Sequence, residues 1–546
     1  MKRSNAVLIA VLTLGLVWTS LAPGQADTRK PDPEKAEPKK AESRADDAKK
    51  APDQAVKKEE KKPETKPVVA VFTLDGPIVE KPLQEDFPLA EPGTKTLKEL
   101  VTRLEKARDD QQVKAVVFLV DEGAVDLAQV EELRQTIDSI KAAGKKVYAH
   151  VDALLETRNF ALAAGASELS VTPTAIIMIT GFSAESPYLR GLLDWIGVKP
   201  DFLACGEYKT AAEMFMRKGP SPAAERMQTW LLDSLFQSCL ESIAQGRKAP
   251  VDQVRQWINE GLYTPEKAKT LRIIDQVEYR EAFEARLRAK YGQDLQFKKD
   301  YGKQREEEID LSSPLALFKV WAEILQGGKK KALPKNSVAI VYVDGPIVPG
   351  KAEQSVLGGD AGAFSTTIRK ALDKAAADEN VKAVVLRVNS PGGSAVASEI
   401  ILNATRQVAA KKPFAVSMGS VAGSGGYYVT CGADTIFADA TTITASIGVV
   451  GGKLATTDLW NKVGIIWDAD HRGANADLLS SEAVFSDDQR KQMQDWMNDI
   501  YGVFKGHVAA ARGKKLRKPI DELAGGRVFT GRQALDLGLV DKIGTL

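Results

Sequence analysis

Val338–Val348 (VAIVYVDGPIV) echoes an earlier stretch of the same chain, Val69–Val79 (VAVFTLDGPIV). The correspondence returns where Val113–Val117 matches Val381–Val385, and again where Gly165-Ala166 matches Gly432-Ala433. Self-similarity of this kind is the sequence signature of a duplication. We therefore expect two related halves, over residues 67–300 and 336–546.

Each half alternates short runs rich in Val and Ile with longer amphipathic patterns. Thr96–Arg108 and Phe364–Ala377 are the clearest helical segments. Strands that alternate with helices are typical of βαβ units, in which a mainly parallel sheet is covered by helices. The sequence predicts an α/β fold built from two tandem βαβ repeats.

The remaining segments have different compositions. Residues 1–26 combine a positive start with the apolar run Ala6–Ala22, so they are expected to be an export signal or a membrane anchor. Residues 27–66 are dominated by Lys, Glu, Asp, Pro and Ala, which predicts a disordered charged linker. Residues 301–335 are expected to be a connector that contains an amphipathic helix, Pro314–Leu325.

Composition narrows the possible functions. The chain has 546 residues and a net charge of +2, so its charge gives no argument for a nucleic-acid partner. Its three cysteines lie far apart and fit neither a disulfide framework nor a zinc site, and no cofactor is expected. With only three histidines, imidazole catalysis would have few candidates.

The two halves differ where chemistry is expected. At a constant offset of 267, Ser424 in Gly423-Ser424-Gly425-Gly426 falls on Thr157, which Arg158-Asn159 follows. The glycine loop Asn389–Ser394 likewise has only Asp121-Glu122-Gly123 opposite it. Conversely, Lys209 in the first half faces Ala476. A serine kept in one half and a lysine kept in the other predict one site shared by both.

Four motifs, taken together in their order along the chain, resemble those of the signal peptide peptidase A (protease IV) family, in its long form with two fused repeats. They are Tyr208-Lys209-Thr210, Asn389–Ser394, Gly423–Tyr427 and Thr444-Ala445-Ser446-Ile447-Gly448. Thr210 stands where members often have Ser, and the second repeat ends five residues after Asp541, which suggests that a last helix is missing. The resemblance implies a membrane-associated serine protease with the Clp protease and crotonase type of fold.

The resemblance also implies roles for particular residues. Ser424 would be the nucleophile, Lys209 the general base, and Ser446 a hydroxyl that positions the lysine. A lysine can act as a base only when neutral, so its pKa must be lowered by burial. We expect the backbone N–H groups of Gly393 and Gly425 to stabilise the oxyanion, because amides beside glycine can be approached closely.

The resemblance further implies a homotetramer, a location outside the cytoplasm that includes anchoring to the inner membrane, and unfolded or cleaved hydrophobic peptides as substrates. Three alternatives remain open. An α/β-hydrolase would use Ser424 with Asp434 and His471 or His507, but Ala422 replaces the glycine that its nucleophile elbow needs. A crotonase-like acyl-CoA enzyme, or a non-catalytic scaffold on the same fold, would not need the Ser-Lys pair.

Overall fold

The computed structural model describes residues 66–81, 95–120, 125–299, 301–303, 334–352 and 362–546. The expected export segment, the charged linker and the connector helix lie outside these ranges. Within them, no helix is both long enough and apolar enough to cross a bilayer.

The first half builds a six-stranded parallel sheet in the order β11-β7-β5-β4-β1-β12. Its central strands are apolar along nearly their whole length because helices cover both faces. The strands are β1 (Val68–Leu74), β4 (Val113–Val120), β5 (Lys146–Val151), β7 (Glu168–Val171), β11 (Gln276–Val277) and β12 (Gln296–Lys298). The main helices are α2 (Leu97–Asp109), α3 (Leu127–Ala142), α4 (Thr157–Ala163), α7 (Pro222–Arg247) and α10 (Arg280–Tyr291).

The second half repeats this order in a sheet with the path β13-β16-β17-β18-β22. These strands are β13 (Ser337–Asp344), β16 (Val381–Ser390), β17 (Phe414–Gly423), β18 (Thr435–Ala438) and β22 (Lys542–Ile543), and β19 (Ile443–Ala445) and β21 (Val528–Thr530) extend the sheet from β17. The helices include α12 (Ser365–Ala377), α13 (Ala395–Ala409), α14 (Gly425–Tyr428) and α16 (Asp487–Arg512). The predicted helices at 96–108 and 364–377 are α2 and α12, and the α/β fold class is confirmed.

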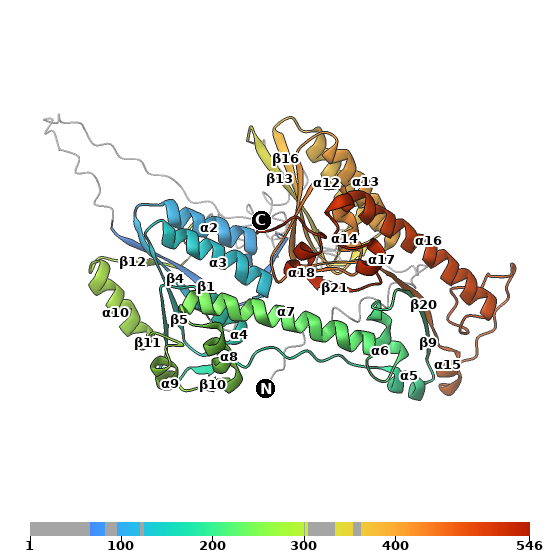
Figure 1. Cartoon of the computed structure of the whole chain (residues 1–546), viewed down its shortest axis with the longest axis horizontal. Helices are drawn as coiled ribbons and strands as arrows, with labels where there is room; N and C mark the ends of the chain where they lie inside the picture. The colour runs from blue at the N-terminus through green and yellow to red at the C-terminus, as the bar shows by residue number, and fades with distance from the viewer. Residues whose placement is uncertain (1–65, 82–94, 121–124, 300, 304–333, 353–361) are drawn as a thin grey trace, which may run out of the picture. The chain divides into compact units, whose positions relative to one another are not determined.

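An antiparallel ribbon joins the two halves (Figure 1). Strand β9 (Lys199–Cys205) of the first half pairs along its whole length with β20 (Val449–Ala455) of the second. Nearby, α7 lies against β21, where the rings of Trp230 and Phe529 are 5.3 Å apart. Because Lys209 lies only four residues after the end of β9, this pairing brings Lys209 close to the second half.

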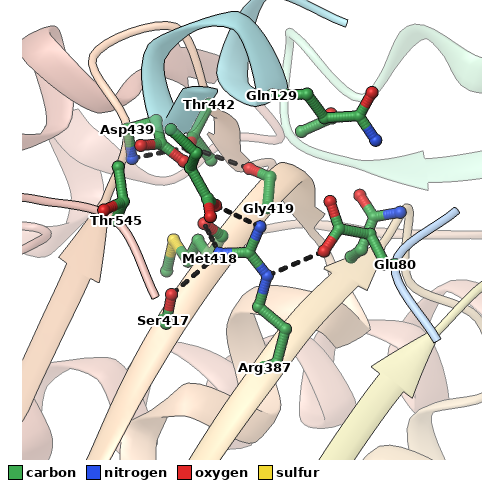
Figure 2. A network of polar contacts seen from close by, with 12 residues as sticks. Glu80, Gln129, Arg387, Ser417, Met418, Gly419, Asp439, Thr442 and Thr545 are labelled. Atoms are coloured by element: carbon green, nitrogen blue, oxygen red, sulfur yellow. Dashed lines mark hydrogen bonds and ion pairs between the residues drawn. The ribbon is translucent and has the colours of Figure 1, made fainter. Parts of the chain in front are cut away.

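A buried ion network also joins the halves, centred on Arg387 of β16 (Figure 2). Its Nε donates to Glu80 at 3.0 Å, and a terminal nitrogen donates to Glu132 of α3. Another nitrogen donates to Ser417 of β17 at 2.8 Å. The position of Arg387 in the first half is taken by Leu119, which contacts apolar side chains of α10. Arg387 therefore lies where the second sheet packs against the first half.

Candidate active site

Three predicted side chains from different segments meet at one point. Lys209 Nζ lies 3.0 Å from Ser424 Oγ, 3.0 Å from Ser446 Oγ and 3.0 Å from the Ser446 carbonyl oxygen. Lys209 belongs to the first half, whereas Ser424 and Ser446 follow β17 and β19 of the second. The structure thus brings together side chains that are more than two hundred residues apart in the sequence.

The backbone at Ser424 has an unusual conformation. Its φ is 51° and its ψ is −118°, between the end of β17 and the start of α14. Its amide donates to Ala445 O at 2.7 Å, and its carbonyl accepts from Tyr428 N at 2.9 Å. Ala445 and Ser446 also have positive φ, at 68° and 53°. Non-glycine residues with positive φ cost free energy and concentrate at functional sites, so the surrounding contacts must hold this turn in place.

The two glycines that follow Ser424 leave no room for a side chain. A Cβ on Gly425 would lie 2.5 Å from Ser398 Oγ, and one on Gly426 would lie 2.5 Å from Ser390 O. Such distances are well inside van der Waals contact, so any side chain would push α14 away from β16 and α13. The glycines therefore allow the turn that carries Ser424 to pack closely against the loop after β16.

Burial controls the protonation state of Lys209. Its side chain is 9% exposed, and this desolvation lowers its pKa to about 8. Desolvation disfavours the ammonium form, so a substantial fraction of the side chain is neutral slightly above neutral pH. A neutral amine has one lone pair and two N–H groups. The N–H groups can donate to Ser446 O and Oγ, which leaves the lone pair facing the Ser424 hydroxyl.

The expected oxyanion donors lie beside one another. A Cβ on Gly425 would be 3.2 Å from Gly393 N, and one on Gly392 would be 2.7 Å from Gly425 N. Gly393 has a φ of 152°, and a Cβ there would lie 2.1 Å from Ile347 O. In the described ranges, neither the Gly393 nor the Gly425 amide donates a hydrogen bond. Two free N–H groups next to a serine are suited to bind a developing oxyanion.

Comparison with known proteins now places the chain in a family. The model of peptidase family S49 matches residues 139–294 and 406–546, together more than half of the chain. The chain belongs to peptidase family S49. The expected class, a serine peptidase of the protease IV type, is thereby confirmed at the level of the family.

Several relatives of this S49 chain carry names. Protease 4 of Haemophilus influenzae is 30% identical over 82% of this chain and 71% of its own length. Protease 4 of Salmonella typhi is 30% identical over 82% of this chain and 70% of its own. The chloroplastic serine protease SPPA of Arabidopsis thaliana is 27% identical over 83% of this chain, which matches 64% of its length.

The segment of the S49 chain that packs against Lys209 and fixes its position was not predicted from the sequence. Tyr208 N donates to Gly525 O at 2.8 Å. Opposite this contact, a Cβ on Gly206 would lie 2.3 Å from Gly525 C, and one on Gly526 would lie 2.6 Å from Lys209 Cα. The turn before Lys209 therefore packs backbone to backbone against Gly525-Gly526. A glycine pair ahead of β21 was the signal available in the sequence.

The histidines of the S49 chain have partners away from Ser424. His471 Nε2 pairs with Glu482 at 3.1 Å, and His507 Nε2 pairs with Glu399 at 2.9 Å. In the part of the chain that the structure describes, the Ser424 hydroxyl is bonded to Lys209 and to neither histidine. This geometry gives no support to the hydrolase alternative.

Proposed function

We propose that this S49 chain is a serine endopeptidase in which Ser424 is the nucleophile and Lys209 the general base. The 3.0 Å contact between Lys209 Nζ and Ser424 Oγ, made by a lysine whose burial lowers its pKa to about 8, carries the proposal. Ser-Lys pairs are a recognised variant of serine catalysis. Ser446 is a positioning residue, because its carbonyl and hydroxyl fix the direction of the amine.

The reaction follows from these positions. Neutral Lys209 takes the Ser424 proton while Oγ attacks the scissile carbonyl carbon, and the oxyanion accepts hydrogen bonds from Gly393 and Gly425. The resulting ammonium gives its proton to the amide nitrogen as the C–N bond breaks, which leaves an acyl ester on Ser424. Lys209 then takes a proton from water as the water oxygen attacks the ester carbonyl, and it returns this proton to Ser424 Oγ as the ester C–O bond breaks and the second product leaves.

Substrates are proposed to be cleaved signal peptides or other unfolded hydrophobic peptides. A putative signal peptide peptidase SppA of Enterococcus faecium, 38% identical over 32% of this chain, supports this class. A crotonase-like acyl-CoA reaction or a scaffold role would leave the lysine contact without a purpose.

We also propose export, anchoring through residues 1–26, and a homotetramer. The β9·β20 ribbon supports assembly, because both strands have counterparts at an offset of 267 in the other half: 466–472 for β9 and 182–188 for β20. Neither counterpart forms a strand, and Ile466 and Trp467 are 86% and 65% exposed. Pairing of these two segments between copies would be head-to-tail, and such contacts form a ring when the rotation between successive copies closes.

A covalent probe tests the dyad. Purified protein is treated with a fluorophosphonate, and the modified residue is mapped by mass spectrometry. We expect an adduct on Ser424 that is lost in Lys209→Ala and kept in the control His471→Ala/His507→Ala. Undiminished labelling of Lys209→Ala, or an adduct elsewhere, would overturn the assignment.

A further inference from the structure

A cavity lies between the halves, over Thr157, the first-half counterpart of Ser424. It has a volume of about 590 Å³, within the range of ligand sites. Thr157, Arg158 and Asn159 line it, and these residues take the positions of Ser424, Gly425 and Gly426. Ser420, Val421, Thr441 and Ile443 of the second half also line it.

The correspondence extends to the rest of the lining. Asp126, which precedes α3, takes the position of Ser394, which precedes α13. Met178 of β8 (Ile176–Met178) takes the position of Ala445, and Gly181 that of Gly448. The cavity therefore corresponds in position to the place beside Ser424 where a peptide substrate would lie, although its side chains differ.

This counterpart lacks the chemistry of hydrolysis. Thr157 Oγ1 accepts a hydrogen bond from Gly181 N at 3.0 Å, so its hydroxyl oxygen is already engaged. Arg158 stands at the position of Gly425, and its side chain pairs with Asp126 at 3.7 Å. Lys209 has Ala476 as its counterpart. What remains is a cleft that can bind and cannot cleave.

The lining indicates the chemistry of the ligand. Apolar side chains form much of the wall, among them Leu127, Met178, Phe182, Leu232, Leu235 and Ile443. Two carboxylates, Asp126 and Glu156, face one guanidinium, that of Arg158. The cavity thus carries a net negative charge and favours neutral or basic ligands over acidic ones.

We propose that this cavity is a non-catalytic binding site for an extended polypeptide segment that carries apolar side chains and a basic residue. The inference rests on the proposed peptidase function, since the ligand is a second segment of polypeptide substrate. Binding at both clefts would hold a long chain at two points and favour long substrates over short ones.

Stoichiometry tests the proposal. A fluorescein-labelled decapeptide of Leu, Ala and two Lys residues is titrated into full-length Ser424→Ala, and bound peptide per chain is measured by equilibrium dialysis. We expect two equivalents per chain. Adding Met178→Trp, which fills the cavity, should reduce this to one. Ile176→Trp, two residues earlier on the same strand and outside the lining, is the matched control and should keep two.

Charge reversal gives an independent variant. Glu156→Lys should weaken the second binding event for the Lys peptide at least tenfold and strengthen it for a peptide with Glu in place of Lys. One equivalent in the parent and in every variant overturns the second site while leaving the peptidase proposal intact. If Ser424→Ala binds no peptide at all, both the second site and the peptidase proposal are contradicted. If the enzyme with Ser424 cleaves peptides but Ser424→Ala binds only one equivalent, the second site alone is contradicted.

Discussion

Ser424 and Thr157 occupy matching turns of the two halves, and the difference between the turns lies mainly in the residues that follow them. Gly425 and Gly426 let α14 pack against Ser390 and Ser398 with no side chain between them. The first half has Arg158 and Asn159 at those positions and still forms the equivalent helix, α4. The fold therefore tolerates both turns, whereas the close packing around the half-buried Ser424 needs the glycines.

Replacing each of the two hydroxyl residues by alanine should give the largest difference in activity between the two turns. Ser424→Ala removes the nucleophile and should lower kcat/KM for peptide hydrolysis by about 10⁴ to 10⁶-fold, as in other serine peptidases. Thr157→Ala should leave turnover within about threefold and cost about 1 kcal/mol of stability, because it removes one buried hydrogen bond. Comparable losses of activity in both variants would contradict the division of labour between the halves.

Lys209 should give activity an alkaline pH dependence. With a pKa lowered to about 8 by burial, the neutral amine becomes more abundant as pH rises, so kcat/KM should increase up to about pH 8 and then level off. Lys209→Met should lose about 10⁴-fold or more in rate at every pH. A rate that falls between pH 7 and pH 9 in the parent enzyme would contradict a lysine base.

The same variant should be more stable than the parent at neutral pH. Because the folded-state pKa of about 8 lies below the unfolded value of about 10.4, the folded state disfavours the ammonium. The cost is about 3 kcal/mol below pH 8, and it disappears as pH rises past the unfolded pKa. Urea unfolding of Lys209→Met should therefore show a gain at pH 7 that shrinks toward pH 10.

Arg387→Leu tests the contact between the halves by installing the residue type that the first half has, Leu119. It leaves Glu80 and Glu132 buried without their cation, which should cost about 3–5 kcal/mol in unfolding free energy. Adding Glu80→Gln and Glu132→Gln should recover much of the loss. Lys491→Ala, which removes an exposed pair, should change stability little. A loss that the glutamines do not reduce would show that the network is not the cause.

The sequence was sufficient to predict the α/β class, the alternation of strands with helices, and the three side chains that meet at the site. Strand periodicity is local, and a duplicated chain provides its own alignment, so positions that differ between the halves stand out. Contacts between distant segments leave no such pattern. Glu80 and Glu132 look like ordinary charged residues in the sequence, and only the packed structure shows both of them at Arg387.

Two neighbouring glycines, Gly525 and Gly526, distinguish the effect of moving Lys209 from the effect of backbone strain. Gly525 and Gly526 have φ values of 75° and 81°, so alanine strains either backbone by about 1–2 kcal/mol. A Cβ on Gly526 would lie 2.6 Å from Lys209 Cα, whereas one on Gly525 meets nothing closer than 3.9 Å. Gly526→Ala should lower kcat about tenfold to a hundredfold, because small displacements of a catalytic group are costly. Gly525→Ala should lose similar stability and keep kcat within about threefold. Equal effects on kcat, measured with the same peptide at pH 8, would mean that the glycine pair only supports the fold.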